Sequence, residues 1–520
     1  MTYEEAASAI VNKSINSAIF IDENAMEPYS QVETVEAKRC VALYNLFKKN
    51  GMSLSIYQYD EKTYEDEKNY LFQNRDLVLL DWKLEGDEGT GEKSLEVISE
   101  IVSNRQHIHF CVIYTSETNK DSVYQNILSY FSGSCRDEYK LMKECLADEE
   151  DEISTIEPLL LELLVCQLNR DRAKSVMGTI CKKTPQLVDR IHKEYGGDRK
   201  TALIKCGIAF ANLITSKSKE PTPSSIDCGT YTLNINNTII AILNKNEIDT
   251  NDVLKIFVDN IANYKWGVMQ LLGLEIRNIV KTKDAFVSNN VLQVTKDSLG
   301  YHKQIHLEDF DSFLKSVMLE QENLTLRSEK LSLVEAIDVT PYNDALNSEY
   351  VSMNIFYNST YIAGDKLLSF GDVFKFGQNY YICITALCDC VRPEKRKNMF
   401  YFAMGESIKV DKALVIGDEG FISYIGSDEC VKWNTNIDSG IDSPTYIIPL
   451  SYCVPDTKIK NGKINIMRFN NCDDKYEVEQ CLFEYKTTIK QNYTQRIANH
   501  AFTHSVRVGI DFVKKIKEEV

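Results

Sequence analysis

The sequence lacks the signals that mark secreted, membrane-spanning and common catalytic proteins. No apolar run approaches the roughly 20 residues that a membrane-spanning helix needs. The N-terminus, MTYEEAASAIVNKS, is acidic and has no signal-peptide core. No P-loop, HExxH motif or Ser-His-Asp order is present, so the common hydrolase and nucleotidase classes have little support. These absences predict a cytoplasmic protein that makes no membrane contact.

The spacing of the cysteines and the net charge further limit the classes of protein to which the chain can belong. The chain has 15 cysteines but no CxxC pair, so the usual spacing of a zinc site is absent. Cys111, Cys166 and Cys383 lie inside apolar runs, which favours buried, reduced thiols. A net charge of −17 argues against a general grip on nucleic acid. The 520 residues, 43% hydrophobic and 26% charged, predict two or three globular domains.

Three short apolar runs near the N-terminus end in residues that can carry chemistry. Leu77–Leu80 runs into Asp81, Ser17–Ile21 into Asp22 and Glu23, and His109–Tyr114 into Thr115. Short apolar runs bounded by polar residues are typical of strands buried on both faces of a parallel sheet. Helical patterns alternate with these runs, which predicts a doubly wound α/β domain over residues 1–135, extending to about 170. Parallel strands present their carboxyl ends at one edge, where such sheets place their sites.

The residue types at this edge suit phosphoryl chemistry. Carboxylates from Asp22, Glu23 and Asp81 are ligands for a hard divalent cation such as Mg²⁺. Asp81 is the candidate nucleophile, because a carboxylate can accept a phosphoryl group. Thr115 would hydrogen-bond the phosphoryl oxygens. A strand that ends in Asp is also common without any site, since Asp caps the next helix or makes a turn. Three strands that end in this order in an acidic pair, an aspartate and a hydroxyl residue favour a functional site over a purely structural role.

The middle and C-terminal parts differ in pattern. Residues 136–345 read as a mostly helical region with a hairpin at Thr230–Leu243 and one long helical pattern at Asn251–Thr282. Residues 346–520 carry short β-type runs, including Tyr380–Cys390, which predict a small β-barrel with a terminal helix. Two features there could bind a metal or act as a nucleophile: Cys388-Asp389-Cys390 and the pair His500 and His504, one helical turn apart. We expect both to be structural.

The motifs IFIDEN (19–24), LLDWKLEG (79–86) and VIYTSE (112–117) resemble the divergent response-receiver domains of bacterial anti-phage operons. GDVF (371–374), YYICITALCD (380–389) and RVGIDF (507–512) resemble the tails of long proteins of that kind, and the effector-less receivers of the Detocs phosphorelay are the most similar group. The resemblance implies that a partner histidine kinase phosphorylates Asp81 and that the backbone carbonyl of Lys83 is a further metal ligand. It also implies a phosphate-sink role that keeps a separate effector protein quiet. Receivers carry a lysine after their fifth strand, and no apolar run between Glu117 and Leu160 ends in one.

Three functions stay open from the sequence. The first is a phosphoacceptor signalling protein that catalyses at most its own phosphorylation and dephosphorylation. The second is a degenerate receiver that only docks partners, and the third is a toxin or effector with its chemistry in the C-terminal domain.

Overall fold

The structure is a computed structural model in which the chain forms two compact units, Met1–Asp338 and Val339–Val520. It describes residues 1–502 except for the segments 30–33, 87–88, 106, 134–135, 168, 217–219, 222, 228–230, 264–266, 283–290, 307–309, 363, 392, 418–420, 434–446 and 473–474.

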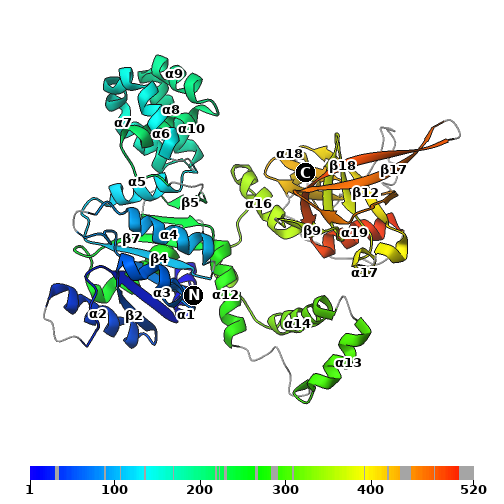
Figure 1. The fold of residues 1–520 in the computed structure, drawn as a ribbon, viewed down its shortest axis with the longest axis horizontal. Helices are drawn as coiled ribbons and strands as arrows, with labels where there is room; N and C mark the ends of the chain where they lie inside the picture. Colours follow the sequence, from blue (N-terminus) through cyan, green and yellow to red (C-terminus); the bar gives the residue numbers. More distant parts are fainter. Residues whose placement is uncertain are drawn as a thin grey trace. The chain divides into compact units, whose positions relative to one another are not determined.

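A seven-stranded sheet organises the first unit, with the strand order β2-β1-β3-β4-β7-β6-β5 (Figure 1). Its strands are β1 (Ser17–Asp22), β2 (Ser53–Gln58), β3 (Leu77–Leu80), β4 (Phe110–Thr115), β5 (Pro223–Asp227), β6 (Thr232–Ile235) and β7 (Thr238–Asn244). The strands β2, β1, β3, β4 and β7 are parallel, and β6 and β5 continue the sheet as antiparallel strands. The predicted α/β class is therefore confirmed. The fifth parallel strand, β7, lies well beyond residue 170, up to which the sequence analysis extended the α/β domain.

Helices cover both faces of this sheet and bury separate cores. One core contains side chains of α3 (Glu61–Phe72), α4 (Glu92–Asn104) and α5 (Lys120–Tyr130). The other contains side chains of α1 (Tyr3–Ser14), α2 (Val35–Lys49), α11 (Val253–Ala262) and α12 (Val268–Thr282). With helices on both faces, every residue of β3 and β4 is buried, as their continuous apolar sequences predict.

Local sequence explains where these helices begin. Thr2 caps α1 with its side chain while Glu5 returns a hydrogen bond to the Thr2 backbone, which forms a capping box. Thr34 and Asp60 cap α2 and α3. Gly91 begins α4 with φ +90°, and a Cβ at this position would collide with the ring of Trp82. Trp82 directly follows Asp81, so this glycine lets the helix approach the loop that carries the site.

A helical insertion separates β4 and α5 from β7. It consists of α6 (Arg136–Cys145), α7 (Glu150–Val165), α8 (Arg170–Lys183), α9 (Pro185–Tyr195) and α10 (Arg199–Phe210), with a short 3-10 turn at Ala147–Glu149. Its buried side chains join the core formed by α3, α4 and α5, and Figure 1 shows its helices gathered beyond α5. The predicted hairpin is present as β6 and β7, joined at Asn236–Asn237. The single long helix expected at Asn251–Thr282 is wrong, because α11 ends at Ala262 and α12 begins at Val268.

Helices predominate among the remaining described residues of the first unit. It contains α13 (Lys296–His306), α14 (Phe310–Leu326), the short α15 (Ser332–Glu335) and a 3-10 turn at Thr250–Asp252 before α11. Helix α14 contacts α12, and α15 contacts α1 and α12.

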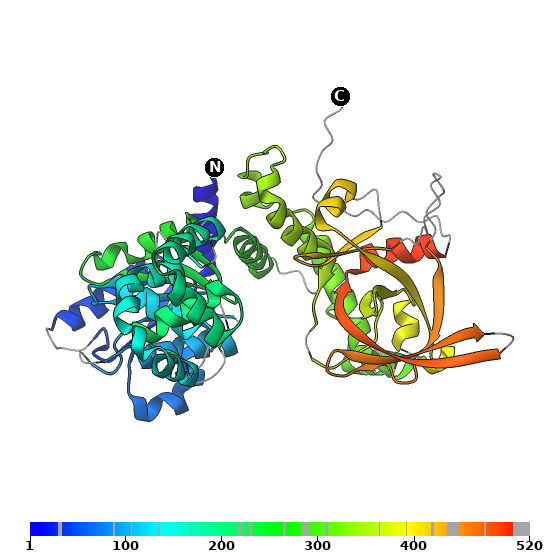
Figure 2. The same ribbon diagram turned by 90° about the horizontal axis from the view of Figure 1, so that it is seen from above.

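The second unit is β-rich, as predicted (Figure 2). Its strands are β8 (Ser359–Thr360), β9 (Lys366–Leu367), β10 (Asp372–Phe376), β11 (Asn379–Cys383), β12 (Met399–Ile408), β13 (Ile422–Gly426), β14 (Glu429–Lys432), β15 (Pro449–Cys453), β16 (Lys458–Ile459), β17 (Lys463–Cys472) and β18 (Lys475–Ile489). Its helices are α16 (Asn347–Asn358), α17 (Leu387–Val391), α18 (Val410–Ile416) and α19 (Gln491–Ala501), with 3-10 turns at Asp344–Leu346 and Pro393–Arg396. Among the described residues, antiparallel pairings close a ring through β10, β18, β17, β15, β12 and β11. Aromatic and aliphatic side chains, including Phe374, Phe402 and Phe483, form a buried core of this barrel.

In the part of the chain that is described, no helix is both long enough and apolar enough to cross a membrane.

Candidate phosphoacceptor site

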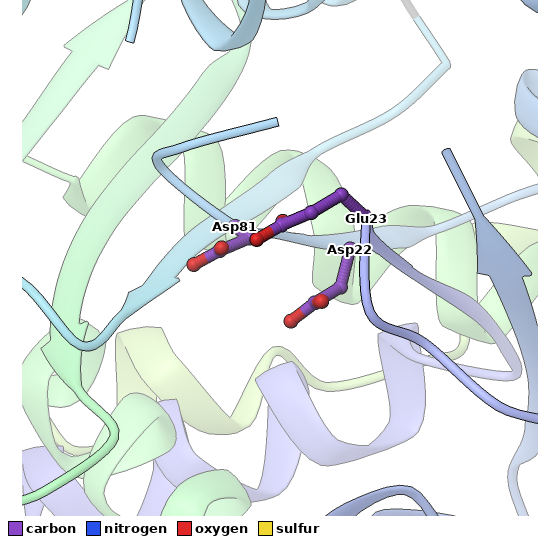
Figure 3. Close-up of side chains that lie close together, drawn as sticks. All are labelled: Asp22, Glu23 and Asp81. Carbon is purple, nitrogen blue, oxygen red and sulfur yellow. The ribbon is translucent and has the colours of Figure 1, made fainter. Parts of the chain in front are cut away.

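Four strand ends meet at the carboxyl edge of the parallel sheet. Asp22 ends β1, Asp81 follows β3, Thr115 ends β4 and Lys245 follows β7. One carboxylate oxygen each from Asp22, Glu23 and Asp81 lies within 4.8 Å of the other two (Figure 3). The sequence-predicted acidic residues are therefore close enough together to share one hard cation.

Lys245 lies between two of these carboxylates. Its Nζ is 2.6 Å from Oδ2 of Asp22 and 2.8 Å from Oδ1 of Asp81. The side chain of Lys245 is only 4% exposed, and its ammonium lies 5.7 and 5.8 Å from the ring centroids of Phe20 and Tyr114. Burial lowers the pKa of Lys245, but attraction to Asp81 and Asp22 outweighs this effect and raises the pKa above its usual value. Lys245 is therefore charged at neutral pH.

Glu23 is the acid of this cluster whose pKa is raised by burial and by the other two carboxylates. Burial, followed by repulsion from Asp81 and Asp22, raises the pKa of Glu23 to about 7. Its Oε2 is buried and has no hydrogen-bond partner among the described residues. A divalent cation would supply the missing partner and offset the repulsion among the three acids, so the residues present fit a Mg²⁺ ion.

Thr115 connects the edge of β4 to the loop after β7. It is 1% exposed, and its Oγ1 accepts a hydrogen bond of 3.0 Å from the backbone N–H of Glu117. The backbone N–H of Lys245 donates to the carbonyl of Thr115 at 2.6 Å, and Nδ2 of Asn244 donates to the carbonyl of Glu117 at 2.8 Å. The loops after β4 and β7 are thus joined beside the carboxylates.

Hydrogen bonds from Ser94 and an ion pair of Lys83 hold the loop after Asp81 in place. The Ser94 hydroxyl contacts the carbonyls of Asp81 and Trp82, each at 2.8 Å. The carbonyl of Lys83, the further metal ligand implied by the resemblance, accepts a hydrogen bond from the N–H of Gly86 at 3.3 Å. The ammonium of Lys83 forms an ion pair with Glu117 at 3.3 Å.

Lys245 is the site residue that the sequence reasoning missed. We expected the lysine before residue 160, but more than 100 residues separate Thr115 from Lys245. A signal for it is present in TIIAILNK (238–245), an apolar run that ends in Asn244 and Lys245. That run was interpreted only as half of a hairpin, although β7 pairs both with β6 and with β4.

The structure does not support the C-terminal candidates. The β-type run predicted at Tyr380–Cys390 would place Cys388 and Cys390 on one face of a strand. This is wrong, because Leu387–Val391 is helix α17, where residues two apart do not share a face. Cys390 is buried, with its thiol near the carbonyl of Thr385, and the neighbouring Cys383 and burial raise its pKa. His500 lies on α19 against Phe421, and His504 lies outside the described residues.

A doubly wound sheet that carries an acidic cluster, a hydroxyl residue and a lysine at its strand ends is the arrangement expected for a receiver. Residues 14–158 match the family model of the response receiver domain. The match supports a receiver domain in this part of the chain, and a receiver domain suggests a phosphoacceptor signalling role. The match ends inside α7, well before β7 and Lys245. Neither the curated proteins nor the solved structures gave a match.

Proposed function

We propose that this protein accepts a phosphoryl group on Asp81 from a partner histidine kinase. The observation that carries the proposal is the pair of contacts from Lys245 to Asp22 and Asp81, because a buried lysine beside buried carboxylates places positive charge where a phosphoryl group would arrive. In the transfer, an oxygen of Asp81 forms a bond to phosphorus while the bond to the donor histidine nitrogen breaks.

The side chains around Asp81 have separate roles in this proposal. Asp22, Glu23 and Asp81, with the carbonyl of Lys83, hold Mg²⁺, which when bound offsets the charge of the phosphoryl group. Lys245 holds the carboxylate of Asp81 in position and stabilises the added negative charge. Thr115 hydrogen-bonds the phosphoryl oxygens. Its resulting movement alters the loop after β7, which is hydrogen-bonded to the Thr115 carbonyl through the backbone N–H of Lys245.

The biological context that we propose is a cytoplasmic phosphorelay of bacterial anti-phage defence, with the chain acting as a phosphate sink for a downstream effector. The motifs around Asp22, Asp81 and Thr115 support this context by resemblance. Replacing Asp81 by Asn in such an operon should then unleash the effector. If the replacement silences the response instead, the chain is the output of the relay and not its sink.

The transfer is tested by incubating the full chain with Mg²⁺ and a small phosphodonor such as acetyl phosphate, or with its kinase. The protein should gain one base-labile acyl phosphate, and Asp81→Asn should abolish it. Asp60→Asn is the matched control: Asp60 follows β2 at the same edge and caps α3, and asparagine caps a helix equally well. Label that persists in Asp81→Asn would contradict the assignment, and an unlabelled wild type would favour the docking-module function.

A further inference from the structure

A cavity of about 400 Å³ lies between helix α12 and the amino-terminal ends of β4 and β7. On the sheet side it is lined by His109, which directly precedes β4, and by Ile239 of β7. On the helix side it is lined by four residues that the argument needs: Gln270, Gly273, Leu274 and Arg277. The volume is within the range of small-molecule sites. The cavity lies at the edge of the sheet opposite to Asp81.

The lining combines apolar walls with one charge. The side chains of Ile239 and Leu274 are buried, at 1% and 5% exposure. Arg277 is the only charged residue among the described ones that line the cavity. A mostly apolar cavity with a few convergent polar groups is the usual form of a binding site for a small organic molecule.

His109 orients the guanidinium of Arg277. Nη1 of Arg277 donates a hydrogen bond to Nε2 of His109. Burial, followed by repulsion from Arg277, lowers the pKa of His109 to about 4, so the ring is neutral at neutral pH and Nε2 accepts the bond. A guanidinium that is fixed in this way is prepared for a ligand before the ligand arrives.

The charges around Arg277 favour one further anion. Asp76 lies 3.6 Å from Nη2 of Arg277 and 4.0 Å from Nζ of Lys281. It also accepts hydrogen bonds from the backbone N–H groups of Asn16 and Ser17, at 2.9 and 3.2 Å. Two cations and one carboxylate leave a local charge of +1, which suits a monoanion. A guanidinium has five N–H donors, so Arg277 retains donors for a carboxylate.

Gln270 supplies an acceptor at the other end of the cavity. Its Nε2 donates to Oδ1 of Asn234 at 3.0 Å, whereas its Oε1 is buried and has no hydrogen-bond partner among the described residues. A buried acceptor without a partner is unfavourable, and a donor on a ligand would satisfy it. Gln270 and Arg277 are two helical turns apart, about 10.5 Å along the axis and on the same face.

We propose that this cavity binds a small organic monocarboxylate with an apolar body and an O–H or N–H donor at the end remote from the carboxylate. The carboxylate pairs with Arg277, the body packs on Ile239 and Leu274, and the donor bonds to Oε1 of Gln270. Gly273 lies between the two polar contacts on α12, and no atom lies within 4 Å of a Cβ placed there. The inference does not depend on phosphorylation of Asp81.

The experiment is calorimetric titration of the full chain with 3-(4-hydroxyphenyl)propionate, whose hydroxyl and carboxylate are at opposite ends of a ring. One molecule should bind per chain, with a dissociation constant below about 1 mM, as expected for a ligand of this size. 3-Phenylpropionate, which lacks the hydroxyl, should bind severalfold more weakly, and the amide of the probe about tenfold more weakly or worse. Non-specific uptake would give the opposite order, because a chain of net charge −17 repels anions.

Two variants assign the polar contacts. Arg277→Met should weaken binding of the probe about tenfold or more and abolish its advantage over the amide. Lys281→Met is the matched control, because Lys281 approaches the same Asp76 but does not line this cavity, and it should bind the probe as wild type does. Gln270→Met should abolish the advantage of the probe over 3-phenylpropionate.

Gly273→Leu tests the cavity without weakening the helix. Glycine destabilises a helix interior relative to leucine, so this variant should unfold at a higher temperature than wild type and yet lose the probe. Gly273→Ala should show the same kind of stabilisation and keep most of the affinity. The inference is overturned if wild type does not bind the probe at 5 mM, if Arg277→Met keeps the preference for the carboxylate, or if Gly273→Leu binds as well as Gly273→Ala.

Discussion

Replacing Lys245 by Met tests whether its buried ion pairs with Asp22 and Asp81 stabilise the folded first unit. Methionine keeps most of the side-chain volume but removes the only charge that directly contacts both Asp22 and Asp81 in the described structure. The side chains of those two acids are 9% and 7% exposed, so their charges would be left buried without compensation. Removing one partner of a buried ion pair costs about 3–5 kcal/mol. We expect a loss of this size in metal-free protein at pH 7.5.

Mg²⁺ should reverse much of this loss, because a cation bound by three uncompensated carboxylates replaces the missing charge. A ligand that binds only the folded state stabilises it by about 2.7 kcal/mol at 100 times its dissociation constant. This increment should be larger in Lys245→Met than in wild type, whose lysine already offsets part of the negative charge.

The assay is native-state hydrogen exchange of peptides from β3 and β4, with EDTA or with Mg²⁺, because it reports the first unit without interference from the second. Lys120→Met is the matched control: Lys120 pairs with Glu247 at 2.7 Å, but the two side chains are 27% and 52% exposed. An exposed pair of this kind contributes at most about 1 kcal/mol. If Lys245→Met in EDTA loses no more stability than Lys120→Met, the reasoning from burial is refuted.

The remaining predictions concern Glu23 and Thr115. The pKa of Glu23 is raised from 4.5 to about 7, so the folded state holds a proton more tightly and this residue's contribution makes metal-free stability fall as pH rises from about 4.5 to 7. Glu23→Gln removes that contribution, so its stability relative to wild type should grow across the same window in EDTA; a pH-independent difference would contradict the assigned pKa. Mg²⁺ affinity of the wild type should also weaken below about pH 7, because the cation competes with the proton, and titration calorimetry at pH 6 and 8 checks this. Thr115→Ala should still be labelled on Asp81, but phosphorylation should no longer alter hydrogen exchange in residues 244–247; an unchanged response there would remove Thr115 from the signalling path.

The sequence was informative where a strand and its chemistry are adjacent. Leu77–Leu80 with Asp81 is a buried strand in one unbroken run, so both the element and the site residue could be predicted. Lys245 could not be placed in the same way, because its strand lies beyond the helical insertion and pairs with β4 only in the folded sheet. A local sequence pattern predicts a hairpin, but it does not identify the third strand with which the hairpin pairs.

The helical pattern at Asn251–Thr282 and the β-type run at Tyr380–Cys390 illustrate a second limit of sequence-based prediction, which concerns where one element ends and the next begins. Apolar residues continue at similar spacing through each stretch, yet each stretch contains more than one element. The run Tyr380–Cys390 predicts a strand, but only Asn379–Cys383 forms one, β11, and the cysteines at 388 and 390 belong to α17. Element boundaries depend on tertiary packing that residue spacing does not record.

The distance in sequence between β4 and β7 also matters while the protein is being synthesised. About 130 residues separate Thr115 from Lys245, and a ribosome that adds roughly 5–20 residues per second needs on the order of 6–26 s to make them. During that interval the nascent chain holds four strands of the sheet, and its open edge is β4, a mostly apolar strand that is buried along its whole length in the finished sheet. Open apolar edges pair with other chains, so a gene fragment that stops before residue 238 should yield an aggregating product. Any chaperone that binds this nascent chain would need to shield β4 until β7 arrives.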